Sequence, residues 1–318
     1  MIASAILAAC GDDAPEDAAD AAVDGRPVDA ASDANGADVV ADATEDASPD
    51  ATLGTIDRTP DPSCGGTWVV GVTGEVRDEA GAPVEDAFTQ TCVRIWPDDV
   101  LACLNPPQTD ATGIYEVLVP ESPRCMSAAA MRVVAPEANF ATTYCHMELT
   151  TTDSVLTPEP FVLYRVDPPV NLPDEGDRAA MRTVQLADGV EIDVIPEQLG
   201  IGADYSRMSA RRVALDATLC FLEGTTDLTA LYAFGLEGRV IGTPFPIRFP
   251  NTEGLAPGTE VDLLILGGLD TQRPDGTYIE EADIEPFGRA TVSDDGRWVA
   301  SDLDAGLPYF SWVGYRPR

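Results

Sequence analysis

Lysine is absent from this 318-residue chain, and histidine occurs once, as His146. Without lysine, the chain cannot form a Schiff base, anchor pyridoxal phosphate or build a Walker-type phosphate loop. A single histidine excludes multi-histidine metal sites. It also leaves one imidazole for any serine or cysteine hydrolase, and no G-x-S-x-G turn is present to expose a nucleophilic serine. We therefore expect His146 to have a structural role.

Positive charge is scarce as well. All 19 cationic side chains are arginine, against 55 Asp and Glu, which gives a formal net charge of −36. A surface this acidic repels phosphate backbones and anionic lipid head groups, so we expect no nucleic-acid partner. The length and the 44% hydrophobic fraction are nevertheless sufficient for two compact domains with real cores.

Long apolar runs are missing too. The opening MIASAILAAC is far shorter than the roughly 20 residues of a membrane-spanning helix. Its last four residues, LAAC, resemble the lipobox of bacterial lipoproteins. That resemblance implies that residues 1–10 are a signal segment and that Cys10 is acylated and holds the chain in a membrane. The positively charged start of such a signal is absent, so we expect a true start upstream. Gly11 lacks the acidic retention signal, which favours the outer membrane of the cell envelope.

Residues 11–60 are predicted to be a disordered tether. Positions 11–53 contain 13 alanines, 13 acidic residues, one arginine and no aromatic residue. Such a composition cannot bury enough apolar surface to offset the entropy lost on ordering. An alanine-rich helix is the alternative, and Pro15, Pro27 and Pro49 disfavour it.

Seven cysteines is an odd number, and acylation of Cys10 would leave six for three disulfides with 15 connectivities. Short loops favour two of the pairs, Cys92 with Cys103 and Cys125 with Cys145. A zinc site is the alternative, but no C-x-x-C pair exists. Three disulfides would place the protein outside the cytoplasm. The six cysteines are Cys64, Cys92, Cys103, Cys125, Cys145 and Cys220.

Beyond the tether, short β-branched and aromatic runs alternate with Gly, Pro and Asp, which predicts an all-β chain. We expect two tandem β-sandwich domains of immunoglobulin or transthyretin type, over residues 64–166 and 181–318. Residues 167–180, rich in proline and acid, read as the linker between them. The predicted strands are 68–76, 88–96, 113–119, 126–134, 139–147, 160–166, 190–195, 231–234, 261–266 and 298–300.

Three motifs in the first domain occur at a familiar spacing: GEVRD at 74–78, GAPV at 81–84 and TDATGIY at 109–115. Gly81 can adopt the positive φ of a tight turn, and the Asp-x-x-Gly segment marks a second turn. The pattern resembles the carboxypeptidase regulatory-like domain over residues 68–166. That resemblance implies a seven-stranded Greek-key sandwich, transthyretin-like, that serves in folding, spacing or binding and has no catalytic residue.

The second domain has Asp-Gly turns at 188, 275 and 295 and a Glu-Gly turn at 237, which are typical of hairpins. The segments FPNT at 249–252, GLAPGT at 254–259 and TVSDDG at 291–296 resemble a β-module of large bacterial surface proteins. The resemblance implies an exposed architectural module and no particular reaction.

Acidic and aromatic residues supply the candidate binding groups. Glu280 and Glu281 begin the densest acidic patch of the second domain, which we interpret mainly as a solvated loop. Paired carboxylates that hydrolyse a glycoside remain an alternative. Aromatic residues gather near the C-terminus, where Tyr309 and Tyr315 adjoin prolines and are expected to be exposed for binding, whereas Trp312 is expected in the core.

We expect no cofactor, with calcium as the alternative. Residues 270–281 have the length of an EF-type loop, but Gln272 and Pro274 occupy ligand positions. Asp302 and Asp304 also approach a D-x-D pattern.

Together these features favour a non-catalytic, lipid-anchored envelope protein that binds or scaffolds an envelope or extracellular protein or glycan. The alternative is a carbohydrate-binding or glycoside-active accessory lipoprotein, and a third interpretation is a structural spacer.

Overall fold

The computed structural model describes residues 52–318 apart from 136–138, 167–176, 201–207, 218, 223–226, 236 and 304. These residues belong to one compact unit. Their regular structure is strands plus the short 3-10 helices η1 (Ala187–Gly189), η2 (Pro196–Gln198) and η4 (Cys220–Leu222), which confirms the all-β prediction. No helix in the described part has the length and hydropathy of a membrane span. Cys10, most of the tether and most of the linker lie outside the described residues.

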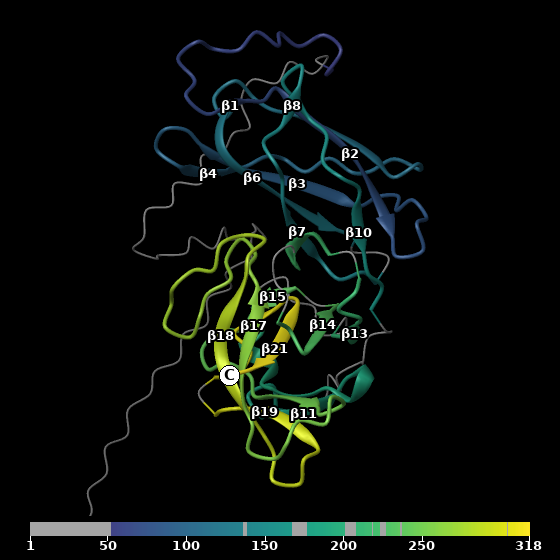
Figure 1. Cartoon of the computed structure of the whole chain (residues 1–318), viewed down its shortest axis with the longest axis vertical. Coiled ribbons are helices and arrows are strands. Elements are labelled where there is room, and N and C mark those ends of the chain that lie inside the picture. The colour runs from purple at the N-terminus through teal and green to yellow at the C-terminus, as the bar shows by residue number, and fades with distance from the viewer. Residues whose placement is uncertain are drawn as a thin grey trace, which may run out of the picture. The chain divides into compact units, whose positions relative to one another are not determined.

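The N-terminal sandwich contains strands β1 to β10, and its first sheet is built around the long strand β6 (Cys125–Val134) (Figure 1). Both β1 (Thr67–Trp68) and β7 (Thr143–His146) pair with one side of β6. On the other side β6 pairs with β3 (Phe88–Ile95), and β3 with β4 (Val100–Cys103). All four pairings are antiparallel.

The second sheet of this sandwich is centred on β2 (Gly71–Asp78). One side of β2 pairs with β5 (Ile114–Leu118), and the other side pairs with β9 (Val155–Leu156) and then with β10 (Phe161–Leu163). The short β8 (Thr151–Thr152) pairs with β9. Alternate side chains of both sheets point inward and form one core, which includes Val72, Val76, Val93, Tyr115, Met131 and Val133.

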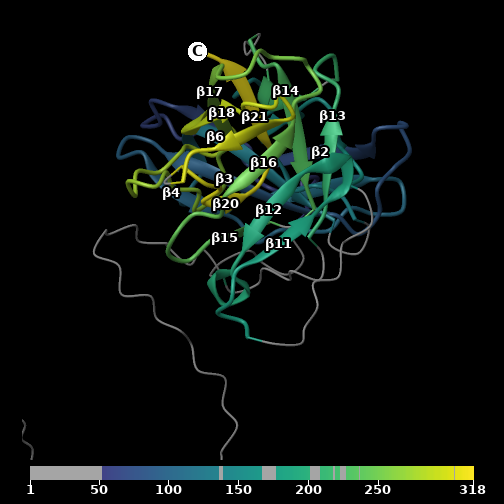
Figure 2. The same cartoon turned by 90° about the horizontal axis from the view of Figure 1, so that it is seen from below.

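The C-terminal β-body contains strands β11 to β21, nine of which form a single antiparallel sheet (Figure 2). In spatial order these nine are β11 (Arg182–Gln185), β12 (Glu191–Val194), β16 (Ile247–Pro250), β19 (Trp298–Ser301), β18 (Ile284–Val292), β17 (Glu260–Leu266), β21 (Val313–Pro317), β14 (Ala230–Phe234) and β13 (Ala210–Val213). A separate two-stranded sheet joins β15 (Gly238–Arg239) to β20 (Tyr309–Phe310). The Asp188-Gly189 and Asp295-Gly296 turns each connect the two strands of a hairpin, as predicted.

The nine-stranded sheet curls around its own core. The Phe249 ring of β16 lies 4.7 Å from the Tyr232 ring of β14 and 5.8 Å from the Tyr315 ring of β21, centroid to centroid, although these strands are not neighbours in the sheet. In addition, the backbone N–H of Arg212 in β13 donates to the Asp188 carboxylate beside β11, 2.7 Å away. The two edges of the sheet therefore meet, which shields strand edges that would otherwise pair with other chains.

Three disulfides are present, and they use all six cysteines of the described residues. The predicted Cys92–Cys103 bond joins directly opposed residues of β3 and β4. The predicted Cys125–Cys145 bond is wrong: Cys125 pairs with Cys64, and Cys145 pairs with Cys220. Loop length alone could not predict this pairing, because the fold of the C-terminal β-body brings η4 against β7. Three disulfides indicate an extracellular or exported protein.

A shared core joins the N-terminal sandwich to the C-terminal β-body, with Trp312 at its centre. The indole packs edge-on against Tyr164 of the sandwich, with 5.7 Å between ring centroids, and against Phe221 at 5.1 Å. Its Nε1–H donates to the carbonyl oxygen of Thr142, 2.9 Å away. Trp312 is fully buried, as predicted.

Removal of the Cys145–Cys220 bond should destabilise the protein more than removal of Cys92–Cys103. The two bonds span 75 and 11 residues, and the chain-entropy relation gives losses of about 4 and about 3 kcal/mol. Denaturant unfolding of the Cys145→Ser/Cys220→Ser and Cys92→Ser/Cys103→Ser double variants measures both. Equal losses, or the reverse order, would contradict this assignment.

Candidate functional site

A row of polar side chains crosses the first sheet of the N-terminal sandwich. Gln90 of β3, Arg132 of β6 and Tyr144 of β7 are directly opposed in the strand register, so their side chains share one face. The Arg132 Nη1 donates to Gln90 Oε1 at 3.4 Å, and the guanidinium carbon lies 6.0 Å from the centroid of the Tyr144 ring. This face meets the C-terminal β-body.

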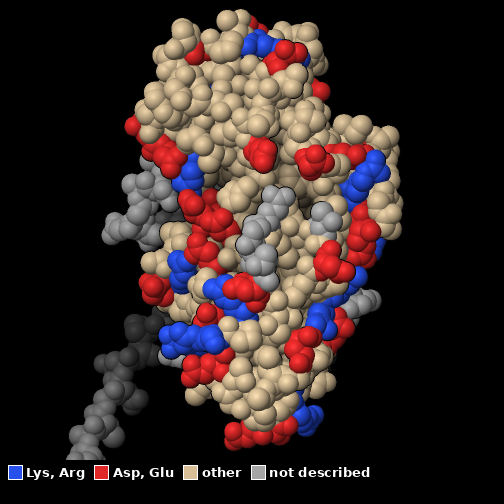
Figure 3. Space-filling model, in the orientation of Figure 1, with Lys and Arg blue, Asp and Glu red and all other residues tan. Residues whose placement is uncertain are grey.

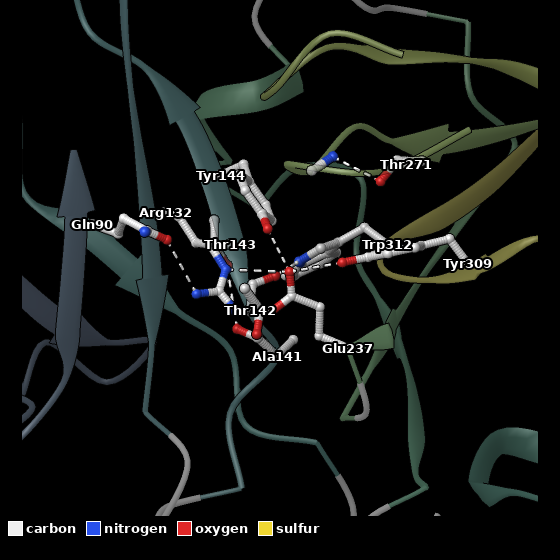
Figure 4. A network of polar contacts seen from close by, with 11 residues as sticks. Gln90, Arg132, Ala141, Thr142, Thr143, Tyr144, Glu237, Thr271, Tyr309 and Trp312 are labelled. Carbon is white, nitrogen blue, oxygen red and sulfur yellow. Dashed lines mark hydrogen bonds and ion pairs between the residues drawn. The ribbon is translucent and has the colours of Figure 1, made fainter. Parts of the chain in front are cut away.

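Glu237 of the C-terminal β-body contacts two members of this row, Arg132 and Tyr144 (Figure 4). Its carboxylate accepts hydrogen bonds from Nε and Nη2 of Arg132, from the Tyr144 hydroxyl and from the Tyr309 hydroxyl, the last at 3.1 Å. Glu237 directly precedes β15, whose Arg239 is opposite Tyr309 of β20, and this pairing holds the acid beside the second tyrosine. The side chain of Glu237 is only 13% exposed. Four charge-assisted bonds compensate the cost of burying its charge.

The environment fixes the protonation of the donors. Burial, followed by the nearby charge of Glu237, raises the pKa of Tyr144 and of Tyr309 far above the usual value for a phenol. Burial lowers the pKa of Arg132, but the charge of Glu237 outweighs this effect, and the net pKa is raised. Both tyrosines therefore remain hydroxyl donors and Arg132 remains a cation across the physiological pH range.

Gly268 allows the C-terminal β-body to approach Tyr144 closely. A Cβ atom at position 268 would lie 2.8 Å from the Tyr144 hydroxyl oxygen, closer than real Cβ contacts allow. Gly268 thus places backbone where a side chain would separate the two surfaces.

The network forms one wall of a hollow with a volume of about 810 Å³. Arg132, Tyr144, Glu237 and Tyr309 form that wall, and the rest of the lining includes Arg239, Ile241, Leu269 and Asp270. The volume falls within the range of roughly 300–1,000 Å³ that is usual for small-molecule sites.

The acidic patch predicted at Glu280 and Glu281 also contacts the N-terminal sandwich. Arg94 of β3 pairs with both carboxylates, at 3.3 and 3.6 Å. His146 hydrogen-bonds to Asp283 across the same contact, at 2.8 Å. Burial, as the largest effect, raises the pKa of Glu281. The interpretation as a solvated loop is therefore wrong for Glu281, whose side chain is only 12% exposed, whereas Glu280 is largely exposed.

The arginines of the described surface lie among acids, as the adjacent blue and red side chains in Figure 3 show. Arg248 is an example, because its guanidinium pairs with Glu191 at 3.0 Å and with Asp193 at 2.9 Å. On this face the acidic and basic side chains are therefore interspersed and do not form separate surfaces.

Two expectations for the aromatic residues are wrong. Tyr309 and Tyr315 are buried, with 5% and 0% exposure. The nearby prolines, Pro308 and Pro317, do not expose these rings. Tyr315 lies inside β21 and packs in the core, and Tyr309 lies in β20 with its hydroxyl directed at Glu237. Of the two, only Tyr309 lines the hollow.

The calcium alternative receives no support from residues 270–281. They form a hairpin in which Gln272 and Tyr278 are bridged and the Asp275 carboxylate accepts bonds from Thr277. Within the described ranges, no group of three His, Cys, Asp or Glu residues is placed to hold a metal ion. Asp304 lies outside these ranges.

Neither a protein-family model nor a curated protein sequence matches the chain. Among solved structures it is similar to 3-chlorocatechol 1,2-dioxygenase from Rhodococcus opacus 1CP, with 13% identity over 33% of this chain and 62% of that chain, and a TM-score of 0.21. It is also similar to the major pilin BcpA of Bacillus cereus, with 10% identity over 77% of this chain and 87% of that chain (TM-score 0.19). The major pilin SpaA of Corynebacterium diphtheriae shows 11% identity over 75% and 84%, with a TM-score of 0.21. No functional conclusion follows from likenesses this distant.

Replacement of Glu237 by alanine should lower the free energy of unfolding by about 3 kcal/mol, because it leaves Arg132 buried without its counter-ion. Chemical denaturation measures this loss. Glu260→Ala is the matched control, since Glu260 forms an exposed pair with Arg318, and it should leave stability nearly unchanged. Equal effects of the two changes would contradict the central role of Glu237.

Glu281 should make stability fall as pH rises. Its raised pKa means that the folded state retains this proton to a higher pH than the unfolded state does, so its contribution declines from the ordinary glutamate pKa up to the raised value. The Glu281→Gln variant should therefore gain stability relative to wild type as the pH is raised through that window. Melting temperatures from pH 4 to pH 8 test this, with Glu280→Gln as control. A constant difference from wild type would disprove it.

Proposed function

We propose that this chain is a lipid-anchored protein of the bacterial cell envelope, acylated at Cys10, that binds or scaffolds its partner without catalysing a reaction. The observation that supports the proposal is that the N-terminal sandwich and the C-terminal β-body are held together, with a hollow at their contact. The Cys145–Cys220 bond, the shared core around Trp312 and the Glu237 network all cross that contact.

The state of the polar groups around the hollow favours binding over catalysis. A general base needs an accessible lone pair and a suitable pKa. The Glu237 carboxylate already accepts four hydrogen bonds, and both tyrosines that contact it have pKa values raised far above neutrality. Hydrolysis of a glycoside needs two available carboxyl groups. Of the two acids that line the hollow, Glu237 is fully engaged, which leaves Asp270.

Two resemblances in the sequence support the location and the module type. The LAAC segment followed by an acidic, alanine-rich stretch fits an anchored protein whose folded part is held away from a membrane. The carboxypeptidase regulatory-like pattern predicts a tight turn at Gly81. Gly81 has a φ of +81° and lies between β2 and Pro83, which is bridged to Arg77, so its conformation is consistent with that turn. We propose that the N-terminal sandwich is a module of that transthyretin-like type.

The anchor and the binding role can be tested on the full chain and its Cys10→Ser variant, expressed in a bacterial host supplied with an alkyne fatty acid. The wild type should carry the label and sediment with membranes, whereas the variant should be unlabelled. When immobilised, both proteins should retain a component of envelope extract or of a polysaccharide panel, with its mass unchanged.

Equal labelling of wild type and Cys10→Ser would overturn the anchor. Conversion of a retained polysaccharide to shorter products would overturn the non-catalytic role and would favour the glycoside-active alternative.

A further inference from the structure

We propose that the 810 Å³ hollow binds a neutral saccharide through Asp270 and Arg239 of its lining. Two residues outside that lining complete the site: Gln272, which is bonded to Arg239, adds to the hydrogen-bonding rim, and Tyr278, which is bridged to Gln272, serves as the aromatic platform. This inference rests on the proposed binding function and names its ligand class. The sequence pattern indicated Asp270 and Gln272 only as part of a calcium loop, and it did not single out Tyr278 or Arg239.

The position of Tyr278 follows from the hairpin that carries it. Tyr278 is bridged antiparallel to Gln272, and directly opposed residues project to the same face. The Gln272 amide oxygen accepts a hydrogen bond from Arg239 Nη2 at 2.9 Å, so this face of the hairpin meets the lining of the hollow. Tyr278 is 60% exposed, an unusual state for a large aromatic side chain of this protein. Its ring is thus available beside the hollow to stack on the flat apolar face of a sugar.

The rim offers polar groups that the protein itself does not satisfy. Among the described residues, the Asp270 carboxylate has no hydrogen-bond or ion-pair partner, and Arg239 bonds only to Gln272 through its side chain. Carboxylate, guanidinium and amide are planar groups that can accept from or donate to neighbouring hydroxyls of one sugar ring. The acceptor on Asp270 and the donors on Arg239, which both line the hollow, fit a ligand that carries both functions at each hydroxyl.

The charge of the lining selects for a neutral ligand. Arg132 and Arg239 balance Glu237 and Asp270, so the hollow is neutral in a chain of net charge −36. An anionic ligand would face the field of the whole protein without a local excess of cations. A cationic ligand would meet the like charges of Arg132 and Arg239 in the same lining.

The wall of the hollow formed by the Glu237 network is already ordered. Tyr144, Tyr309 and Arg132 are fixed on Glu237, so binding would not require these side chains to lose further freedom. A second hollow, about 190 Å³ near Arg94, is less suitable, because Arg94 is already paired with Glu280 and Glu281.

The test uses the full chain with three neutral trisaccharides, namely cellotriose, chitotriose and mannotriose, in saturation-transfer NMR and isothermal titration. At least one should bind. Tyr278→Ala and Asp270→Asn should each weaken that binding about tenfold, because each removes one stacking or hydrogen-bonding contact. Tyr278→Phe, which keeps the ring, and Asp294→Asn, an exposed acid of another turn, should bind as wild type. Circular dichroism and the melting temperature confirm that each variant is folded.

The outcomes separate the two proposals. If no trisaccharide binds while the immobilised chain still retains an envelope component, the saccharide site is wrong and the binding function stands. Binding that is unchanged in both Tyr278→Ala and Asp270→Asn would place the ligand elsewhere and overturn this site. If the trisaccharide binds and is then shortened, the site stands and the non-catalytic function fails.

Discussion

The burial of the Glu237 charge is the constraint on which the contact between the N-terminal sandwich and the C-terminal β-body depends. No single part of the chain can satisfy this carboxylate, because Arg132 and Tyr144 come from the sandwich and Tyr309 comes from the same body as the acid. Separation of the two surfaces would leave Arg132 and Glu237 without each other, and an uncompensated buried charge is costly. The shared core around Trp312 contributes the larger apolar area, whereas the Glu237 network fixes which atoms of the two surfaces must face each other.

The scarcity of cations explains how the chain uses them. With 19 arginines and no lysine, each cation has a planar group of several donors and can hold more than one acceptor. Arg132 bonds to Glu237 and Gln90, Arg94 pairs with two glutamates, and Arg248 bridges two acids across β12 and β16. Acids at these contacts are balanced locally, and the remaining acids add to the net negative charge that keeps the surface well hydrated.

Local patterns in the sequence were sufficient for much of the fold. Alternating apolar residues identified β3, β6 and β17 almost to their ends, and the Asp-Gly pairs identified two hairpins. Strand β18 was missed because Pro286 and Gly288 interrupt its pattern, at a point where the pairing with β17 is also irregular. The Glu237 network could not be found in this way, because Arg132 and Glu237 are 105 residues apart and neither has a distinctive neighbour. The register of β6 with β7 and of β15 with β20 is what brings the groups together.

The same arrangement limits what the hollow can do. A carboxylate that already accepts four hydrogen bonds has little free acceptor capacity, and phenols whose pKa values are raised by burial and by that acid do not ionise to become nucleophiles. These groups instead provide a wall whose positions are set before any ligand arrives, which reduces the entropy that binding would cost. Chemical freedom remains at the rim, where Asp270 and Arg239 are not neutralised by partners of their own and Tyr278 is exposed. A fixed wall and an unsatisfied rim are the division of roles that the proposed binding function requires.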